Sequence, residues 1–143
     1  IIFPVSPMDA RLQAKERVHG IISGGASRAY RFSSFDDSDG IIHDEVDGTP
    51  VVVVADNMRS YIVSYERTLA DGTVLSFGKP SVADIAEGTV ILEDSEGNQW
   101  NIFGEAVAGP RTGQKLQGTT SFMGYWFAWG AFYPDMAIYN DGR

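Results

Sequence analysis

The sequence predicts a mainly β fold of the β-rich α+β kind: one compact domain of short antiparallel strands with one or two short helices. Sixteen of the 143 residues are glycines, and they separate short runs of β-branched and aromatic residues, a pattern typical of strands joined by tight turns. The length suits one domain, and 43% hydrophobic against 21% charged residues supplies a core. We divide the chain into an N-terminal arm, residues 1–17, and a single β-rich domain, residues 18–143.

The expected strands follow from local composition and from turn residues. The Gly24-Gly25 pair predicts a hairpin turn. Four consecutive valines at positions 51–54 predict a strand buried on both faces, because they lack the polar alternation of a half-exposed strand. The expected strands are residues 18–23, 28–32, 49–55, 60–68, 74–77, 90–93, 99–103 and 136–139, with further turns at residues 70–72 and 95–98.

Two segments are expected to be helical. Residues 9–17 are good helix formers and predict two turns. In residues 122–133, aromatic side chains recur at helical spacing and Pro134 follows, so the pattern predicts a short helix that is aromatic nearly all round. Such a helix must be buried, either as a core element that closes the β-structure or against a partner.

The composition excludes several function classes. A formal net charge of −8 argues against nucleic-acid binding, which requires a basic surface. Because there is no cysteine, thiol catalysis, disulfides, iron–sulfur clusters and cysteine-ligated zinc are excluded. Two histidines are too few for a His-rich metal site, so we expect no cofactor and no tightly bound transition metal.

No apolar run approaches the roughly 20 residues that cross a bilayer. We therefore expect no membrane-spanning segment, while a peripheral contact with a membrane complex is compatible with the sequence.

An acidic stretch between positions 36 and 47 contains the calcium candidates. The pattern Asp37-x-Asp39-Gly40 resembles part of an EF-hand loop, but Phe35 and Val46 stand where that loop needs ligands. An irregular, weak calcium site at Asp36, Asp37 and Asp39 is therefore the alternative to a solvated acidic turn, which we favour.

The expected contact residues for a protein partner, or for self-association, lie in two apolar segments. The arm begins with Ile1, Ile2 and Phe3, which should dock rather than remain in water. In the aromatic segment, Tyr125, Trp126 and Trp129 are of the residue types that anchor interfaces.

Candidates for ligand binding and catalysis are few. Trp100 and Glu105 are candidates for lining a ligand pocket, together with the tryptophans of the aromatic segment. The two histidines, His19 and His43, are expected at the surface or at a strand edge. A hydrolase would use Glu105 or an aspartate together with His43, but the spacing of these residues in the sequence does not identify a catalytic triad.

Three blocks of the sequence resemble one family. The first is VHGII at residues 18–22 with RAY at 28–30; the second is GIIHD at 40–44 with GTPVVV at 48–53; the third is WNIFGEAVAGP at 100–110, then Gly113, Leu116, YWFAW at 125–129 and FYPD at 132–135. Their order and spacing resemble the bacterial and archaeal domain of unknown function 3179 family, over residues 18–139. The resemblance implies one continuous domain and, from the usual setting of its members, an extracytoplasmic location, periplasmic or extracellular.

The chain departs from the family pattern at two places. Members typically carry a Cys-Pro-Leu-Cys-type turn after the valine strand, and here Asp56 and Arg59 stand at the two cysteine positions. Members often show Trp-His-Glu before that strand, and here the positions are Ser38-Asp39-Gly40. If the family uses that cysteine pair and histidine for metal or redox chemistry, this chain has lost the ligands.

These observations leave three hypotheses open. The first is a non-catalytic interaction or structural module, such as an accessory subunit of a larger assembly. The second is a small-molecule or metal-binding domain that uses the acidic loop or a tryptophan-lined pocket. The third is a hydrolase. We favour the first, because the cysteines and a histidine constellation are missing while the apolar arm and the aromatic segment are present.

Overall fold

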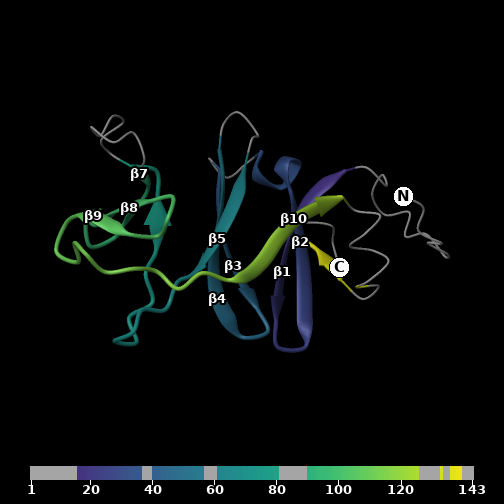
Figure 1. The fold of residues 1–143 in the computed structure, drawn as a ribbon, viewed down its shortest axis with the longest axis horizontal. Helices are drawn as coiled ribbons and strands as arrows, with labels where there is room; N and C mark the ends of the chain where they lie inside the picture. Colours follow the sequence, from purple (N-terminus) through teal and green to yellow (C-terminus); the bar gives the residue numbers. More distant parts are fainter. Residues whose placement is uncertain are drawn as a thin grey trace.

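The computed structural model describes residues 16–36, 40–56, 61–80, 90–125, 133 and 136–139. These residues form three β-sheets that lie side by side as layers (Figure 1). Sheet A has the strand order β10-β1-β2-β11, sheet B the order β3-β4-β5, and sheet C the order β6-β7-β8-β9. Sheet B is the middle layer, so both of its faces are covered.

The elements have the following bounds. The strands are β1 Arg17–Ser23, β2 Ala26–Arg31, β3 Ile41–Val46, β4 Thr49–Ala55, β5 Ile62–Glu66, β6 Phe77–Gly78, β7 Val90–Asp94, β8 Gln99–Asn101, β9 Ala106–Ala108, β10 Thr120–Tyr125 and β11 Ala137–Ile138, and a 3-10 helix, η1, spans Phe32–Phe35. The predicted β-rich fold is confirmed, and the described residues contain this single short helix.

The valine strand is buried on both faces, as predicted. It is β4, the central strand of the middle sheet, and residues 51–54 are at most 4% exposed. Val51 and Val53 join the core between sheets A and B, whereas Val52 and Val54 join the core between sheets B and C. Because side chains alternate along a strand, an unbroken valine run serves two cores at once.

The two predicted hairpins are also present. Gly24 and Gly25 connect β1 to β2, and residues 95–98 connect β7 to β8. Gly24 has a φ of +56°, and a Cβ there would lie 1.8 Å from the Asp47 carboxylate, so the position requires glycine.

The aromatic segment corrects the helix prediction. Its first residues, up to Tyr125, belong to β10, which pairs antiparallel with β1 from Arg17↔Tyr125 to Ile22↔Thr120. Aromatic residues also favour strands, and pairing with the edge of β1 outweighs the helical spacing. Residues 126–132 lie outside the described residues.

Other predicted elements are shifted or lie outside the described part. Residues 9–15 of the predicted N-terminal helix lie outside it, and Arg17 begins β1. After the turn at 70–72, the returning segment makes one bridge, Thr68↔Val74, and then leaves for sheet C as β6. The last predicted strand is present as β11, which pairs in parallel with β2.

In the described ranges, no helix has the length and apolar character needed to cross a membrane.

Candidate functional site

The outer edge of β5 is only partly paired. The backbone N–H of Glu66 donates to the carbonyl of Gln117 at 2.7 Å, and an antiparallel bridge joins Tyr65 to Gly118. The segment before β10 therefore borders β5 from Glu66 to Ser64, which lies opposite Thr119. From Thr120 onward that segment pairs with β1 instead. The chain thus runs from sheet C past sheet B into sheet A (Figure 1). Among the described residues, no strand borders Ile62 and Val63 at the start of β5 on this side.

Backbone hydrogen bonds show which groups face this edge. The N–H of Arg67 donates to the carbonyl of Pro50 in β4 at 3.0 Å, and the N–H of Glu66 points the other way, to Gln117. Because the direction alternates along a strand, the N–H groups of Ile62 and Ser64 also point away from β4. No described residue accepts a hydrogen bond from either of them.

A hollow of about 350 Å³ lies beside this edge. It is lined by residues 62–65 of β5 and by His19, Ile102, Ser121 and Met123. We call it the edge hollow. The hydroxyl of Tyr65 donates to the carbonyl of Ile102 and so ties the turn after β8 to β5.

A cluster of hydroxyls surrounds His19, and His19, Ser64 and Ser121 line part of the hollow. His19 Nε2 lies 2.8 Å from Ser64 Oγ, which in turn lies 2.5 Å from Thr119 Oγ1 and 3.3 Å from Ser121 Oγ. Thr119 and Ser121 are themselves 2.9 Å apart. Strand alternation explains the cluster, because His19 and Ile21 of β1 face sheet B while Val18 and Ile22 face the opposite side of sheet A.

The prediction that His19 lies at the surface or at a strand edge is wrong, since the residue is 4% exposed and β1 is an inner strand of sheet A. Burial lowers the pKa of His19 to about 4, so the ring is neutral at physiological pH. A Ser–His contact is the arrangement of an activated nucleophile, but so weak a base removes a proton poorly. No described carboxylate contacts the ring to stabilise its charged form.

Of the residues in the hydrolase hypothesis, Glu105 and His43 are both described, and the structure does not bring them together. His43 Nε2 accepts a hydrogen bond from the backbone N–H of Phe77 at 3.0 Å, which joins β3 of sheet B to β6 of sheet C. Burial, and then the charge of Arg67, lower the pKa of His43. The Glu105 carboxylate is exposed and accepts from the Asn101 amide at 3.1 Å. Among the described residues, no contact joins His43 to Glu105.

Trp100, expected to line a pocket, lies in the core instead. It is 0% exposed, and its indole N–H donates to Asp94 Oδ2 at 2.7 Å. A fully buried indole cannot contact a ligand in this conformation. Its predicted companions Trp126 and Trp129 lie outside the described residues.

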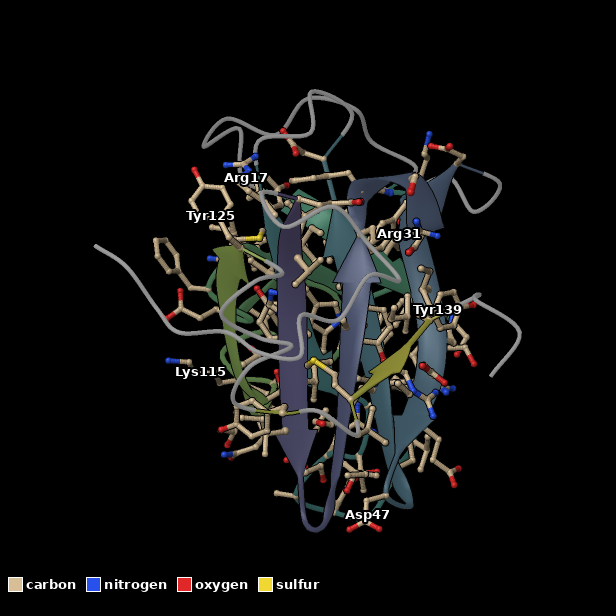
Figure 2. All side chains as sticks on the ribbon, turned by 90° about the vertical axis from the view of Figure 1, so that its right-hand side faces the viewer. Arg17, Arg31, Asp47, Lys115, Tyr125 and Tyr139 are labelled. Atoms are coloured by element: carbon tan, nitrogen blue, oxygen red, sulfur yellow. The ribbon has the colours of Figure 1, made fainter. Side chains whose placement is uncertain are left out.

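Of the predicted partner-binding residues, Tyr125 is described. It is 49% exposed and lies beside Arg17 at one end of sheet A (Figure 2). Ile1, Ile2, Phe3, Trp126 and Trp129 lie outside the described residues.

The sequence reasoning missed Phe103, which is 68% exposed beside Ile102 of the edge hollow. Its turn is held by Asn101, whose side-chain oxygen accepts from the N–H groups of Phe103 and Glu105 at 3.0 and 2.9 Å. The Asn-x-Phe-Gly sequence at residues 101–104, between β8 and β9, was the available signal, because asparagine caps such turns.

The calcium candidates are not assembled among the described residues. Asp36 is exposed, and Asp37 and Asp39 lie outside the described part. Within the described ranges, no group of three or more His, Asp or Glu side chains is placed to hold a metal ion. The nearby Asp44 accepts hydrogen bonds from Arg28 and Tyr30, both at 2.8 Å, and so joins sheets A and B at the edge opposite the hollow.

Gly40 and Asp56, the described residues of the two departures from the family pattern, lie at one end of sheet B. Ala55 N–H donates to the carbonyl of Gly40 at 2.8 Å, and Asp56 follows directly. Asp56 stands at a family cysteine position, and its carboxylate accepts the Tyr61 N–H at 2.9 Å. Gly40 has a φ of +82°, and a Cβ there would lie 2.6 Å from the Ala55 carbonyl oxygen, so a glutamate at this position requires a different turn.

Comparison with known proteins adds the family. The family model described as "Protein of unknown function (DUF3179)" matches residues 1–136. No curated protein and no solved structure matches the chain. The matched range includes the arm as well as the three blocks that indicated the family, and the chain has no cysteine. Since the match covers nearly the whole chain, the protein belongs to the DUF3179 family and is a member without the Cys-x-x-Cys-type turn.

Proposed function

We propose that the chain is a non-catalytic interaction module, an accessory subunit of a larger assembly, which takes up an extended segment of a protein partner along the open edge of β5. The observation that carries the proposal is the outward-facing N–H of Ile62, from which no described residue accepts a hydrogen bond and which no described strand borders. An extracytoplasmic setting belongs to the same proposal, supported by the usual setting of the family.

An extended peptide is the natural ligand of such an edge. Its carbonyls accept hydrogen bonds from the free N–H groups of the sheet, and its alternate side chains enter pockets on either side. The edge hollow lies beside Ile62 and Ser64 and supplies such pockets. Strand addition also pairs the backbone groups of an open edge, which is otherwise prone to unwanted pairing.

Exposed aromatic side chains near the hollow support a macromolecular partner. Phe103 follows the lining residue Ile102, and Tyr125 lies two positions after Met123 on the same face of β10. Aromatic residues beside an apolar pocket are frequent anchors of protein interfaces.

The test separates the contribution of the Ile62 backbone N–H to peptide binding from the contribution of the Ile62 side chain. Full-length protein is used to select binders from a displayed library of random peptides. Ile62→Pro removes the outward N–H and leaves the β4–β5 ladder intact, whereas Ile62→Ala loses a comparable amount of packing but keeps the N–H. We expect the selected peptides to bind Ile62→Pro at least tenfold more weakly than Ile62→Ala.

Equal binding to the two variants, or a library that yields no binder, overturns the proposal. Circular dichroism of both variants shows that each retains the β-rich fold, so that a loss of binding reports on the edge and not on unfolding.

A small polar molecule is the second candidate ligand, favoured by the volume of the hollow, which lies within the range of ligand pockets. Such a ligand would contact side chains and not the free N–H groups. It would therefore bind Ile62→Pro and Ile62→Ala equally and lose affinity in Ser121→Val.

A further inference from the structure

We infer that the partner segment is uncharged at its centre and flanked by basic residues, with small hydroxyl side chains facing sheet A and apolar side chains facing sheet C. The inference rests on the proposed function and names the chemistry of the partner.

The two sides of the β5 edge differ. Ile62 packs in the core between sheets A and B and Ser64 contacts His19, whereas Val63 and Tyr65 pack toward sheet C. A strand added beside β5 keeps the same alternation, because neighbouring strands present side chains to the same two faces. Its side chains must therefore enter two environments in turn.

The side toward sheet A is a hydroxyl environment. Ser121 contacts Thr119 at 2.9 Å and Ser64 at 3.3 Å. A hydroxyl can take part in up to three hydrogen bonds, so Ser121 retains capacity for one more. A small hydroxyl side chain of the partner extends this cluster without leaving a buried polar group unpaired.

The side toward sheet C is apolar. Ile102 and Val63 line the hollow there, and the exposed ring of Phe103 lies next to Ile102 in the chain. An apolar side chain of the partner removes this surface from water.

Charge selects the flanks. The hollow has no charged lining residue, because burial keeps His19 neutral, so a charge at the centre of the segment would be desolvated without a counter-ion. The whole chain carries a net charge of −8, which attracts basic flanking residues and repels acidic ones.

The experiment compares synthetic peptides of fixed composition. The first has alternating valine and serine between lysine flanks, the second has the same residues in two blocks, and the third is the alternating centre between glutamate flanks. Each is titrated by fluorescence anisotropy into the full-length protein and into its Ile62→Pro, Ile62→Ala and Ser121→Val variants.

We expect the alternating, lysine-flanked peptide to bind at least tenfold more tightly than either of the others, and to lose that affinity in Ile62→Pro but not in Ile62→Ala. In Ser121→Val an apolar side chain replaces the hydroxyl that retains capacity for a further hydrogen bond, so the alternating, lysine-flanked peptide should bind this variant more weakly than it binds the unmodified protein.

The outcomes distinguish the two proposals. If the alternating and block peptides bind with equal affinity, or the glutamate flanks do not weaken binding, the inferred partner chemistry is wrong. The proposed binding of an extended segment along β5 still stands in that case, as long as Ile62→Pro abolishes binding. If none of the three peptides binds but peptides selected from the library do, the inferred chemistry alone fails. If neither set binds, both proposals fail.

Discussion

His19 Nε2 lies 2.8 Å from Ser64 Oγ, and this contact joins sheet A to sheet B across a separation of 45 residues in the chain. The ring is 4% exposed and, in its neutral form, can make this hydrogen bond without the cost of a buried charge. The contact therefore couples the stability of the fold, and the shape of the edge hollow, to the protonation of one histidine.

Acidification should destabilise the protein through His19. Its pKa falls from 6.5 to about 4 on folding, so the unfolded chain binds more protons between these values, and stability is lost as the pH drops through this window. At about 1.4 kcal/mol per unit, the loss approaches about 3 kcal/mol.

The measurement is the free energy of unfolding in urea at pH 7.5 and pH 4. His19→Gln keeps a polar side chain that does not titrate, so the difference between the two pH dependences isolates His19. Identical pH dependences in the two proteins would show that His19 is not the titrating group.

The link between sheets B and C should respond to a second histidine. His43 accepts the Phe77 N–H at 3.0 Å, and protonation of Nε2 would remove the acceptor. Since the pKa of His43 is lowered in the folded state, its contribution is also lost as the pH falls below about 6.5. At pH 7.5, His43→Ala should lower the free energy of unfolding by about 1 kcal/mol. The backbone amides of Phe77 and its neighbours should also exchange hydrogen faster in this variant. An unchanged exchange rate would contradict the proposed link between sheets B and C.

The middle sheet supports two cores, so truncation on either face of β4 should be costly. Val52→Ala and Val53→Ala each remove two methyl groups from 0% exposed side chains that face opposite layers. Each should lower the free energy of unfolding by roughly 2 kcal/mol. Val74→Ala, at a side chain 50% exposed, is the control and should change it by less than about 0.5 kcal/mol.

Equal losses at positions 52 and 53 are the sign of a sheet covered on both faces. A loss at only one of them, measured in urea, would mean that one face of β4 is exposed in solution.

The success and failure of the sequence predictions have a physical reason. The valines at 51–54 predict a strand covered on both faces, because four consecutive apolar residues place apolar side chains on both sides of a strand. Residues up to Tyr125 satisfy helical spacing equally well, and only pairing with β1, about one hundred residues earlier in the chain, decides in favour of a strand. Local patterns cannot carry that information.

The candidate site was unpredictable for the same reason. His19, Ser64 and Ser121 are unremarkable in the sequence and come from three strands of two sheets. The open edge depends on where the chain before β10 leaves sheet B, which no residue type marks. Trp100 illustrates the opposite error: an aromatic residue in a recognisable block was expected to meet a ligand, and it fills the core.

The role of Trp100 can be tested through its indole N–H. Trp100→Phe keeps an aromatic ring but removes the donor to Asp94 Oδ2, an acceptor on a residue that is 6% exposed. The variant loses one hydrogen bond to Asp94 and some packing around the smaller ring. The free energy of unfolding, measured in urea, should therefore fall by about 1–3 kcal/mol. Trp100→Phe combined with Asp94→Asn should cost less than the sum of the single changes, because both act on one hydrogen bond; strict additivity would rule out that coupling.

Phe103 should matter for binding and not for folding. Its ring is 68% exposed, while its backbone N–H donates to the Asn101 side chain at 3.0 Å, so the backbone that carries the ring is ordered before any partner binds. Pre-organisation of this kind lowers the entropy lost on binding, and exposed aromatic residues are frequent anchors. Phe103→Ser should therefore leave the free energy of unfolding within about 0.5 kcal/mol of the wild type and weaken the selected edge-binding peptides at least fivefold in fluorescence anisotropy. Val107→Ser, at a side chain 40% exposed on β9, is the matched control and should leave both values unchanged. If Phe103→Ser binds the peptides as tightly as Val107→Ser does, the partner passes along the β5 edge without touching the turn.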